Sequence, residues 1–343
     1  MGKAIDSFPI SQKRNKDLEY GHMKEIALGI DIGGTTIKSA FVDKEGNLLH
    51  KFVLPVPHHE DQYLTLKRLS EAVQKAIDEL PSDEKLVGIG CGCPGAINTF
   101  KGTCDYSNNL GWRDLPVAKI LEESLHFPVM IDNDANAAML GEIRFGCGKK
   151  FHNAILLTLG TGVGGGLYLN DRLYVGNEGK GAELGHMVVF AGGRECTCGR
   201  KGCLEAYASA SALINETKEA MNENPDSLMW KRCPDIEKVG GALAFECAKE
   251  GDETAKTVIA NYIYYLGEGV LNFVNIFRPE AIILSGGVSK QGENLRKPLV
   301  DFLEERGYGF GSKWCPKVEI LISTLGADMG IYGAAAIGFE NAK

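Results

Sequence analysis

Asp134 is the residue best placed to act as a general base. It lies in FPVMIDNDANAAMLGEIRFG (127–146), where a short apolar strand is expected to pass directly into a helix. Transfer of a phosphoryl group to a hydroxyl needs a carboxylate that accepts the hydroxyl proton, while backbone amides, Mg²⁺ and a loop hold the phosphates. The neighbouring Asn133 amide can bind a second hydroxyl. The alternative is that Asp132, Asn133 or Asp134 only caps the helix.

Two glycine turns have the composition of phosphate-binding loops. Gly33, Gly34 and Thr35 follow Asp31, and GTGVGG occupies 160–165, with Thr161, Gly162 and Gly164. Glycine lets the backbone approach a ligand closely, and successive N–H groups can form an anion nest. The Asp31 carboxylate can position hydrated Mg²⁺. The alternative is that each turn is only a tight hairpin.

The second turn matches the dinucleotide fingerprint G-x-G-x-x-G only formally. That fingerprint requires a helix after the glycines, and here LYLNDRLYV (167–175) has the pattern of strands, so we reject NAD binding. The chain also lacks the G-K-[ST] ending of a P-loop. Gly286 and Gly287 follow the apolar run AIIL and form a third candidate, at the carboxyl end of a strand.

Cysteine and histidine residues form a candidate zinc site. Cys196, Cys198 and Cys203 lie in CTCGRKGCLE, and His186 precedes them in GAELGHM. Three thiolates and an imidazole make a closed tetrahedral set suited to structural Zn²⁺, although an unligated thiol cluster and an open catalytic zinc are the alternatives. If the segment before His186 is helical, Glu183 projects from the same face. The remaining cysteines are expected to be small core residues.

Several further polar residues could bind a substrate with many hydroxyl groups. Such a substrate needs both donors and acceptors, and buried polar groups of this kind discriminate strongly between ligands. The residues that could supply them are Asn109, Asn133, Glu183 and Glu205.

The elements that must position these residues follow a repeated pattern. Residues 26–56 predict three strands separated by a Gly-Gly turn and a polar turn at 45–47, and residues 154–175 repeat that meander. Helices are expected at 63–80, 242–249, 254–277 and 330–339, and buried strands at LVGIGCGCPG (86–95) and AIILSGGVS (281–289). The whole is interpreted as two α/β halves around a cleft.

Composition favours a small-molecule ligand. The 343 residues are 44% hydrophobic and carry a formal charge of −8, which disfavours nucleic-acid binding because that mode needs a basic face. No apolar run is long enough to span a membrane and no secretory leader is visible, so a cytoplasmic protein with free thiols is expected. Residues 1–23 are interpreted as a polar tail or a cloning-derived segment.

The motifs IDIGGTTIK, NDAN, LGTGVGGG, GAELGH and CTCGRKGCLE, in this order, resemble the ROK family of sugar kinases and repressors. The resemblance covers about Lys24 to the C-terminus. It implies an actin-like (ribonuclease H-like) two-domain α/β fold, with ATP and sugar in the interdomain cleft. The N-terminal domain would comprise 24–136 and 327–343, and the C-terminal domain 137–326, with the zinc knuckle at 186–203.

The resemblance also implies roles for individual residues. Asp134 would be the general base, Asp31 through Thr35 and Thr161 through Gly164 would hold phosphates, and Gly286 and Gly287 would face the adenosine. The residues matching the family's sugar contacts are Asn109, Asn133, Asp134, Glu183, His186 and Glu205, and His186 would also bind zinc.

The expected function is ATP-dependent phosphorylation of a hexose, with glucose converted to glucose 6-phosphate. The alternatives are an N-acetylmannosamine, N-acetylglucosamine or fructose kinase and, in a different class, a non-catalytic sugar sensor. Repressor members carry an N-terminal helix-turn-helix, and the residues before this domain are too few and too polar to build one, so DNA binding is not expected. The resemblance suggests a homodimer or homotetramer.

Overall fold

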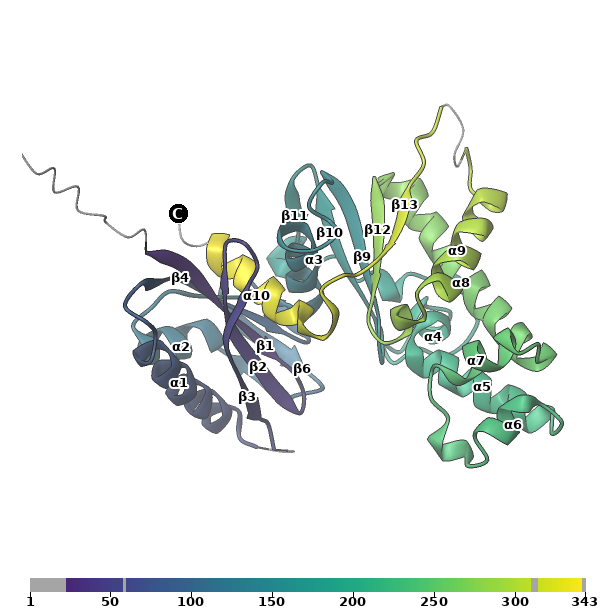
Figure 1. The fold of residues 1–343 in the computed structure, drawn as a ribbon, viewed down its shortest axis with the longest axis horizontal. Coiled ribbons are helices and arrows are strands. Elements are labelled where there is room, and N and C mark those ends of the chain that lie inside the picture. The colour runs from purple at the N-terminus through teal and green to yellow at the C-terminus, as the bar shows by residue number, and fades with distance from the viewer. Residues whose placement is uncertain (1–22, 58–59, 310–313, 341–343) are drawn as a thin grey trace, which may run out of the picture.

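Two five-stranded sheets, one in each half of the chain, form the framework of the molecule (Figure 1). The computed structural model describes residues 23–57, 60–309 and 314–340, so the expected tail at 1–23 lies outside the described residues except for Met23. The N-terminal sheet contains β1 (Lys24–Ile32), β2 (Thr36–Asp43), β3 (Leu48–Pro55), β4 (Glu84–Cys93) and β8 (Val129–Asn133). The C-terminal sheet contains β9 (Asn153–Leu159), β10 (Val163–Leu169), β11 (Arg172–Tyr174), β12 (Ala281–Ser285) and β13 (Glu319–Ile322).

The two sheets share one topology. Their strand orders are β3-β2-β1-β4-β8 and β11-β10-β9-β12-β13. In each sheet the first three strands form an antiparallel meander, and the last two strands join it in parallel. The repeated meander predicted from the sequence is therefore confirmed, as are the strands expected around 86–95 and 281–289.

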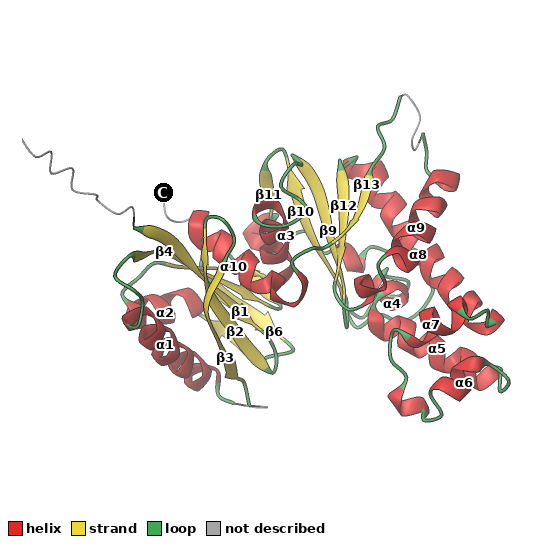
Figure 2. Ribbon diagram, in the orientation of Figure 1, coloured by secondary structure: helices red, strands yellow, loops and turns green. Residues whose placement is uncertain are grey.

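Helices cover the sheets and fill the C-terminal half (Figure 2). The α-helices are α1 (Gln62–Asp78), α2 (Val117–Leu125), α3 (Asp134–Arg144), α4 (Glu205–Ala208), α5 (Ala210–Glu223), α6 (Leu228–Arg232), α7 (Leu243–Lys249), α8 (Glu253–Phe277), α9 (Glu293–Arg306) and α10 (Met329–Glu340). The helices expected from the sequence correspond to α1, α3, α7, α8 and α10. The first of them ends at Asp78, two residues before the predicted end.

The segments inserted between the strands differ in the two halves. Between β4 and β8 lie α2 and a small sheet of β5 (Ala96–Asn98), β6 (Thr103–Ser107) and β7 (Trp112–Leu115). Between β11 and β12 lie the cysteine-containing segment, several short 3₁₀ turns and helices α4 to α8. Each half has its own large buried apolar cluster, one built around β1 and β4 and the other around β9 and α8.

The last helix, α10, returns to the N-terminal sheet and packs on β1, β4 and α3. Gly88 and Gly90 of β4 permit this close approach, because a Cβ atom there would lie 1.9 Å from the Gly338 carbonyl oxygen and 2.0 Å from that of Ala334. α3 contacts α10 on one side and β10 on the other. The division of the chain at 136/137 and 326/327 stays a prediction, and α3 lies at this proposed junction.

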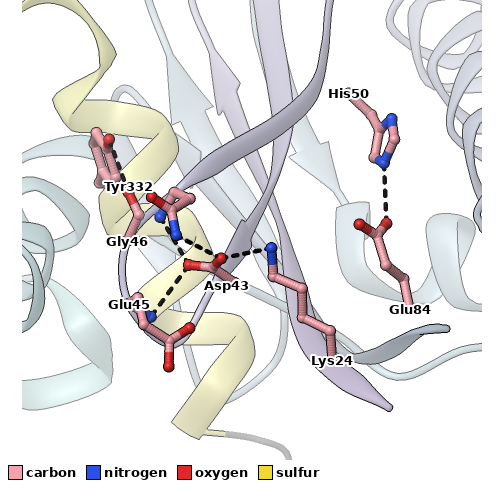
Figure 3. A network of polar contacts seen from close by, with 8 residues as sticks. Lys24, Asp43, Glu45, Gly46, His50, Glu84 and Tyr332 are labelled. Carbon is pink, nitrogen blue, oxygen red and sulfur yellow. Dashed lines mark hydrogen bonds and ion pairs between the residues drawn. The ribbon is translucent and has the colours of Figure 1, made fainter. Parts of the chain in front are cut away.

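A polar network ties the first meander to α10 (Figure 3). The Asp43 carboxylate accepts a hydrogen bond from the Asn47 backbone N–H (2.7 Å) and pairs with the Lys24 ammonium at 2.8 Å. Gly46, with a φ of 90°, accepts a hydrogen bond from the Tyr332 hydroxyl at 3.1 Å. The turn at 45–47 is thereby held against the last helix. Across the described ranges, no helix combines the length and apolar character needed to cross a membrane.

Candidate active site

Asp134 is the first residue of α3 and follows β8 directly. The helix cap is its neighbour: the Asn133 side-chain oxygen accepts hydrogen bonds from the N–H groups of Ala135 (2.8 Å) and Asn136 (3.4 Å). The Asp134 Oδ1 also accepts from the Ala135 N–H, at 2.9 Å. Because Asn133 provides the cap, the capping alternative does not account for the carboxylate of Asp134.

Both the oxygen and the nitrogen of the Asn133 side-chain amide form hydrogen bonds within the protein. In addition to capping α3, its Nδ2 donates to the Gly95 carbonyl at 3.1 Å. One amide hydrogen therefore remains for the sugar contact predicted from the sequence. The structure adds an orienting function, since these bonds fix the start of α3 and with it the Asp134 backbone.

The surroundings of Asp134 make its carboxylate a stronger base. The side chain is open to a pocket but has protein atoms on its other sides, and this removal from bulk water raises the pKa of its carboxyl group. The Ala135 N–H and the Asn133 side chain oppose that rise. Burial also raises the pKa of Asp31, and the charge of Asp134 adds to this effect while Lys38 opposes it. The two carboxylates are thus electrostatically linked.

A pocket of about 550 Å³ brings together nine of the predicted site residues. It lies where the ends of β8 and β9 meet the segments inserted into both halves. The predicted residues that line it are Asn109, Asn133, Asp134, Thr161, Gly162, Gly164, Glu183, His186 and Glu205. Lining residues that sequence reasoning missed include Gly95, Ala96, Ala135 and Thr158.

The first glycine turn does not line this pocket, but it lies beside it. A Cβ atom on Gly34 would be 3.2 Å from the Asn109 carbonyl oxygen. Gly33 closes the turn by donating to the Thr36 carbonyl at 2.9 Å. The half-buried Asp31 carboxylate accepts no hydrogen bond from another described residue, so it keeps the capacity to bind a cation or its water ligands.

The second glycine turn presents free backbone donors to the pocket. Within the described chain, the N–H groups of Thr161 and Gly162 have no acceptor, as is also true of Gly34 and Thr35 in the first turn. Such donors suit a phosphate oxygen. Gly164 has a different reason to be glycine, because a Cβ atom there would lie 2.5 Å from the Thr158 hydroxyl oxygen. That hydroxyl accepts the Gly164 N–H at 3.0 Å and fixes the start of β10.

Gly286 and Gly287 follow β12 and lie outside the pocket lining. Gly286 has a φ of 88° and lies against the end of β9, where its Cβ atom would be 2.6 Å from the Leu159 carbonyl. Among the described residues, its chain neighbours apart, no atom lies within 4 Å of the Cβ position of Gly287. This third glycine pair therefore flanks the start of the second turn on an open side.

The four predicted zinc ligands come together. One ligand atom from each of His186, Cys196, Cys198 and Cys203 lies within 4.8 Å of the others, and no further group of this kind occurs in the described ranges. The Cys196 Sγ lies 3.6 Å from the His186 Nδ1, and the Cys198 Sγ lies 3.7 Å from the Cys203 Sγ. Three sulfurs and one ring nitrogen with this spacing fit a structural Zn²⁺ ion.

Glu205 connects this cluster to the second glycine turn. Its Oε2 accepts a hydrogen bond from the Val163 N–H at 3.0 Å, and its Oε1 accepts one from the Thr197 hydroxyl at 2.9 Å. The Cys196 thiol lies 3.7 Å from the same Oε1. The conformation of the cysteine loop therefore determines where a pocket carboxylate points.

Glu183 and His186 both reach the pocket, although not from an α-helix. The segment Leu184–His186 is a single 3₁₀ turn, in which the His186 N–H donates to the Glu183 carbonyl at 3.1 Å. Burial raises the pKa of Glu183, with smaller contributions from Asp134 and Glu205, while His186 opposes the rise. Several carboxylates thus share one polar site, as a polyhydroxylated ligand would require.

The two α/β halves, the glycine turns and the cleft carboxylate together define an actin-like two-domain fold built to hold a phosphate donor and an acceptor. The ROK family sequence model matches residues 27–340, and the chain belongs to that family.

Similar proteins agree with this assignment. The chain is 38% identical to a glucokinase of Halalkalibacterium halodurans, over 89% of this chain and 92% of that protein. It is 34% identical to a glucokinase of Thermotoga maritima, over 90% and 96% of the two chains. A ROK family glucokinase from Streptomyces griseus, solved with glucose and AMPPNP, superimposes with a TM-score of 0.75 at 31% identity, covering 92% of this chain and 99% of that one.

Proposed function

We propose that this protein is an ATP-dependent hexose kinase that converts glucose to glucose 6-phosphate. The observation that carries the proposal is the placement of Asp134 in one pocket with the free N–H groups of Thr161 and Gly162. A proton acceptor and a phosphate cradle in one pocket are what phosphoryl transfer to a hydroxyl requires. The glucokinases named above share about a third of their residues with this chain, which supports glucose as the acceptor.

Asp134 is proposed to take the proton of the attacking sugar hydroxyl. The raised pKa of its carboxyl group favours this step, since such a carboxylate binds a proton more strongly than an ordinary aspartate does. Asn133 keeps the helix start in place. The sugar would be oriented by the side chains that line the pocket around Asp134, namely Asn109, Asn133, Glu183, His186 and Glu205.

The glycine turns are proposed to hold the phosphates of ATP. Thr161 and Gly162, whose N–H groups have no acceptor among the described residues, line the pocket, and Gly34 and Thr35, with N–H groups equally without acceptors, lie beside it. Asp31 fits a hydrated Mg²⁺ ion, which when bound would neutralise charge on the phosphates. Gly286 and Gly287 are proposed to face the adenosine, where the absence of atoms near the Gly287 Cβ position leaves room.

Zn²⁺ is proposed as a structural ion held by His186, Cys196, Cys198 and Cys203. When bound, it would fix the cysteine loop, and the loop would hold Glu205 through Thr197. The family resemblance further supports a homodimer or homotetramer. The protein is proposed to be cytoplasmic and to act where glucose enters glycolysis. The cleft would lie between a domain of residues 24–136 plus 327–343 and a domain of residues 137–326.

A comparison of acceptors tests the proposal. ADP release should be measured with glucose, mannose, fructose, N-acetylglucosamine and N-acetylmannosamine, and kcat/KM should be highest for glucose. A higher value for another sugar would replace the proposed substrate. Sugar binding without ADP release from any of the five would instead indicate a non-catalytic sensor.

A further inference from the structure

The chain crosses between its two halves at two places. The first crossing, residues 145–152, leads from α3 to β9, and the second crossing, residues 323–328, leads from β13 to α10. Figure 1 shows the second crossing as the yellow segment between β13 and α10. A movement of one half relative to the other can be accommodated at these two segments and at the start of α3, which packs on both α10 and β10.

The Glu142 side chain joins the two crossings. This residue of α3 is fully buried, with 0% of its surface exposed. Its Oε1 accepts a hydrogen bond of 2.5 Å from the Ser323 hydroxyl in the second crossing. Its Oε2 accepts hydrogen bonds from Cys147 in the first crossing, one from the backbone N–H (3.0 Å) and one from the thiol (3.2 Å).

The chain around Glu142 is shaped to receive its carboxylate. Gly146 lies so close that a Cβ atom there would be 2.0 Å from the Glu142 Oε2. The N–H groups of Gly146 and Gly148 donate to the Glu142 carbonyl at 3.1 and 2.9 Å. The first crossing therefore wraps around the end of α3, with the Glu142 carboxylate at its centre.

Ser323 connects the same carboxylate to both halves. Its backbone N–H donates to the Leu284 carbonyl of β12 at 2.9 Å. Its hydroxyl also lies 3.8 Å from the sulfur of Met329, the first residue of α10. The Glu142–Ser323 bond thus lies between the C-terminal sheet and the helix that packs on the N-terminal sheet.

A carboxylate at this position is costly. It is buried, it has no cationic partner among the described residues, and it lies in the last turn of its helix, where the helix dipole disfavours negative charge. An apolar residue would fill the same volume without that cost. The presence of Glu142 is explained if its two carboxylate oxygens are needed to bind Ser323 and Cys147 at the same time.

We propose that Glu142, Cys147 and Ser323 form a clasp that joins the two crossings and fixes the orientation in which the halves close on each other. Glu142 is then a positioning residue that acts through α3, the helix that begins with Asp134. α3 packs on β10, where a Cβ atom on Gly164 would lie 3.2 Å from the Ala135 Cβ, so the base is held against the second glycine turn. Asp31 and the first turn belong to the other half, and the clasp sets their approach.

Ser323→Ala tests the clasp with little risk to folding, since it removes one hydroxyl and leaves the bonds to Cys147. This expectation rests on the proposed hexose kinase function. In Ser323→Ala, kcat should fall about tenfold or more because the reacting groups are misplaced, and glucose KM should change by less than about threefold. Glu142→Gln should keep most turnover, because its amide can donate to Ser323 and accept from Cys147. A purely structural contact would instead lower the melting temperature and leave kcat unchanged.

Glu319→Gln is the matched control. Glu319 forms an exposed ion pair of 3.0 Å with Lys150, which joins β13 to the first crossing at the surface. Exposed pairs contribute little, so kcat should not change.

Amide hydrogen exchange separates this proposal from the kinase proposal. Ser323→Ala should speed exchange in residues 145–152 and 323–328 together, whether or not glucose is phosphorylated. Faster exchange in 323–328 alone, or unchanged kcat in Ser323→Ala, would overturn the clasp. An inactive wild-type protein would overturn only the kinase proposal.

Discussion

The N-terminal and C-terminal sheets share one strand order, but the segments inserted before their last strands differ in kind. The turns of the two repeated meanders carry the free N–H groups proposed to hold phosphates. The N-terminal insert contributes Asn109, and the C-terminal insert contributes Glu183, His186 and Glu205. Under the proposed function, the repeat and the inserts have different roles: the repeated turns would bind the phosphates, and the inserts would recognise the acceptor.

Asp134 lines the pocket together with residues of the second glycine turn and of both inserts. Its substitution should have the largest effect on kcat. Asp134→Asn should lower kcat about 10²- to 10⁴-fold, because the amide cannot accept the hydroxyl proton. The glucose Kd, measured by calorimetry, should remain close to that of the wild type.

Asp132→Asn is the matched control for this prediction. Asp132 is buried two residues earlier, has its pKa raised to about 6 by burial, and accepts hydrogen bonds from Asn133 and Asn136 without lining the pocket. It should keep most turnover. Equal losses of kcat in the two variants would mean that Asp134 acts only through the local fold.

Removal of the metal tests whether the C-terminal insert shapes the sugar site. A chelator or Cys198→Ser should lower the melting temperature and raise glucose KM about tenfold, because the loop that holds Glu205 loses its cross-link. Cys233→Ser changes a cysteine of the same half outside the cluster and should leave both unchanged. Elemental analysis should first verify that the metal is lost. An unchanged melting temperature and unchanged kinetics after that loss would contradict the proposed link between the metal and the sugar site.

Two single substitutions test whether the inserts bind the sugar and the repeated turns bind ATP. Asn109→Ala should raise glucose KM roughly fivefold, the effect of losing about 1 kcal/mol of hydrogen bonding, with ATP KM unchanged. Thr161→Ala should raise ATP KM and leave glucose KM unchanged, because it removes a hydroxyl from the second glycine turn. Steady-state kinetics with each substrate varied in turn would reveal both, and parallel changes in the two KM values would refute this division of roles.

The smallest expected effect concerns pH. The base must be ionised, so kcat/KM should fall as pH decreases through the pKa of Asp134, which burial raises above the ordinary aspartate value. A raised folded-state pKa means that protonation of Asp134 itself favours the folded state, so this loss of activity does not come from unfolding at Asp134. The acid limb should therefore lie at higher pH than for an aspartate with the ordinary pKa, and Asp132→Asn should retain it.

The site was predictable wherever a short motif carries the chemistry. Asp134, the second glycine turn and the cysteine cluster each occupy a few neighbouring residues, and the meander repeat follows from alternating apolar residues. Asn133 was predicted as a sugar contact and as one of three possible helix caps, but its bond to Gly95 depends on the register of β8 and β4. Thr158 was missed for a similar reason, since its contact with Gly164 requires the β9–β10 pairing.

Long-range contacts explain most of what the sequence did not reveal. Glu142 and Ser323 are separated by 181 positions, and no local pattern links them. Helices such as α5 and α9 depend on packing in the C-terminal half, where the apolar cluster around α8 receives them. The expected end of α1 was two residues too late because Glu79 caps the helix before Pro81.

The most direct measurement is the fate of the ATP γ-phosphate in the presence of glucose. Wild-type protein should be incubated with glucose, ATP and Mg²⁺ and the products followed by phosphorus NMR. We predict equal amounts of ADP and a sugar monophosphate esterified at the primary hydroxyl, with neither formed by Asp134→Asn at a comparable rate. Glucose binding without any sugar phosphate, or unchanged product formation by Asp134→Asn, would contradict the proposed function of this pocket.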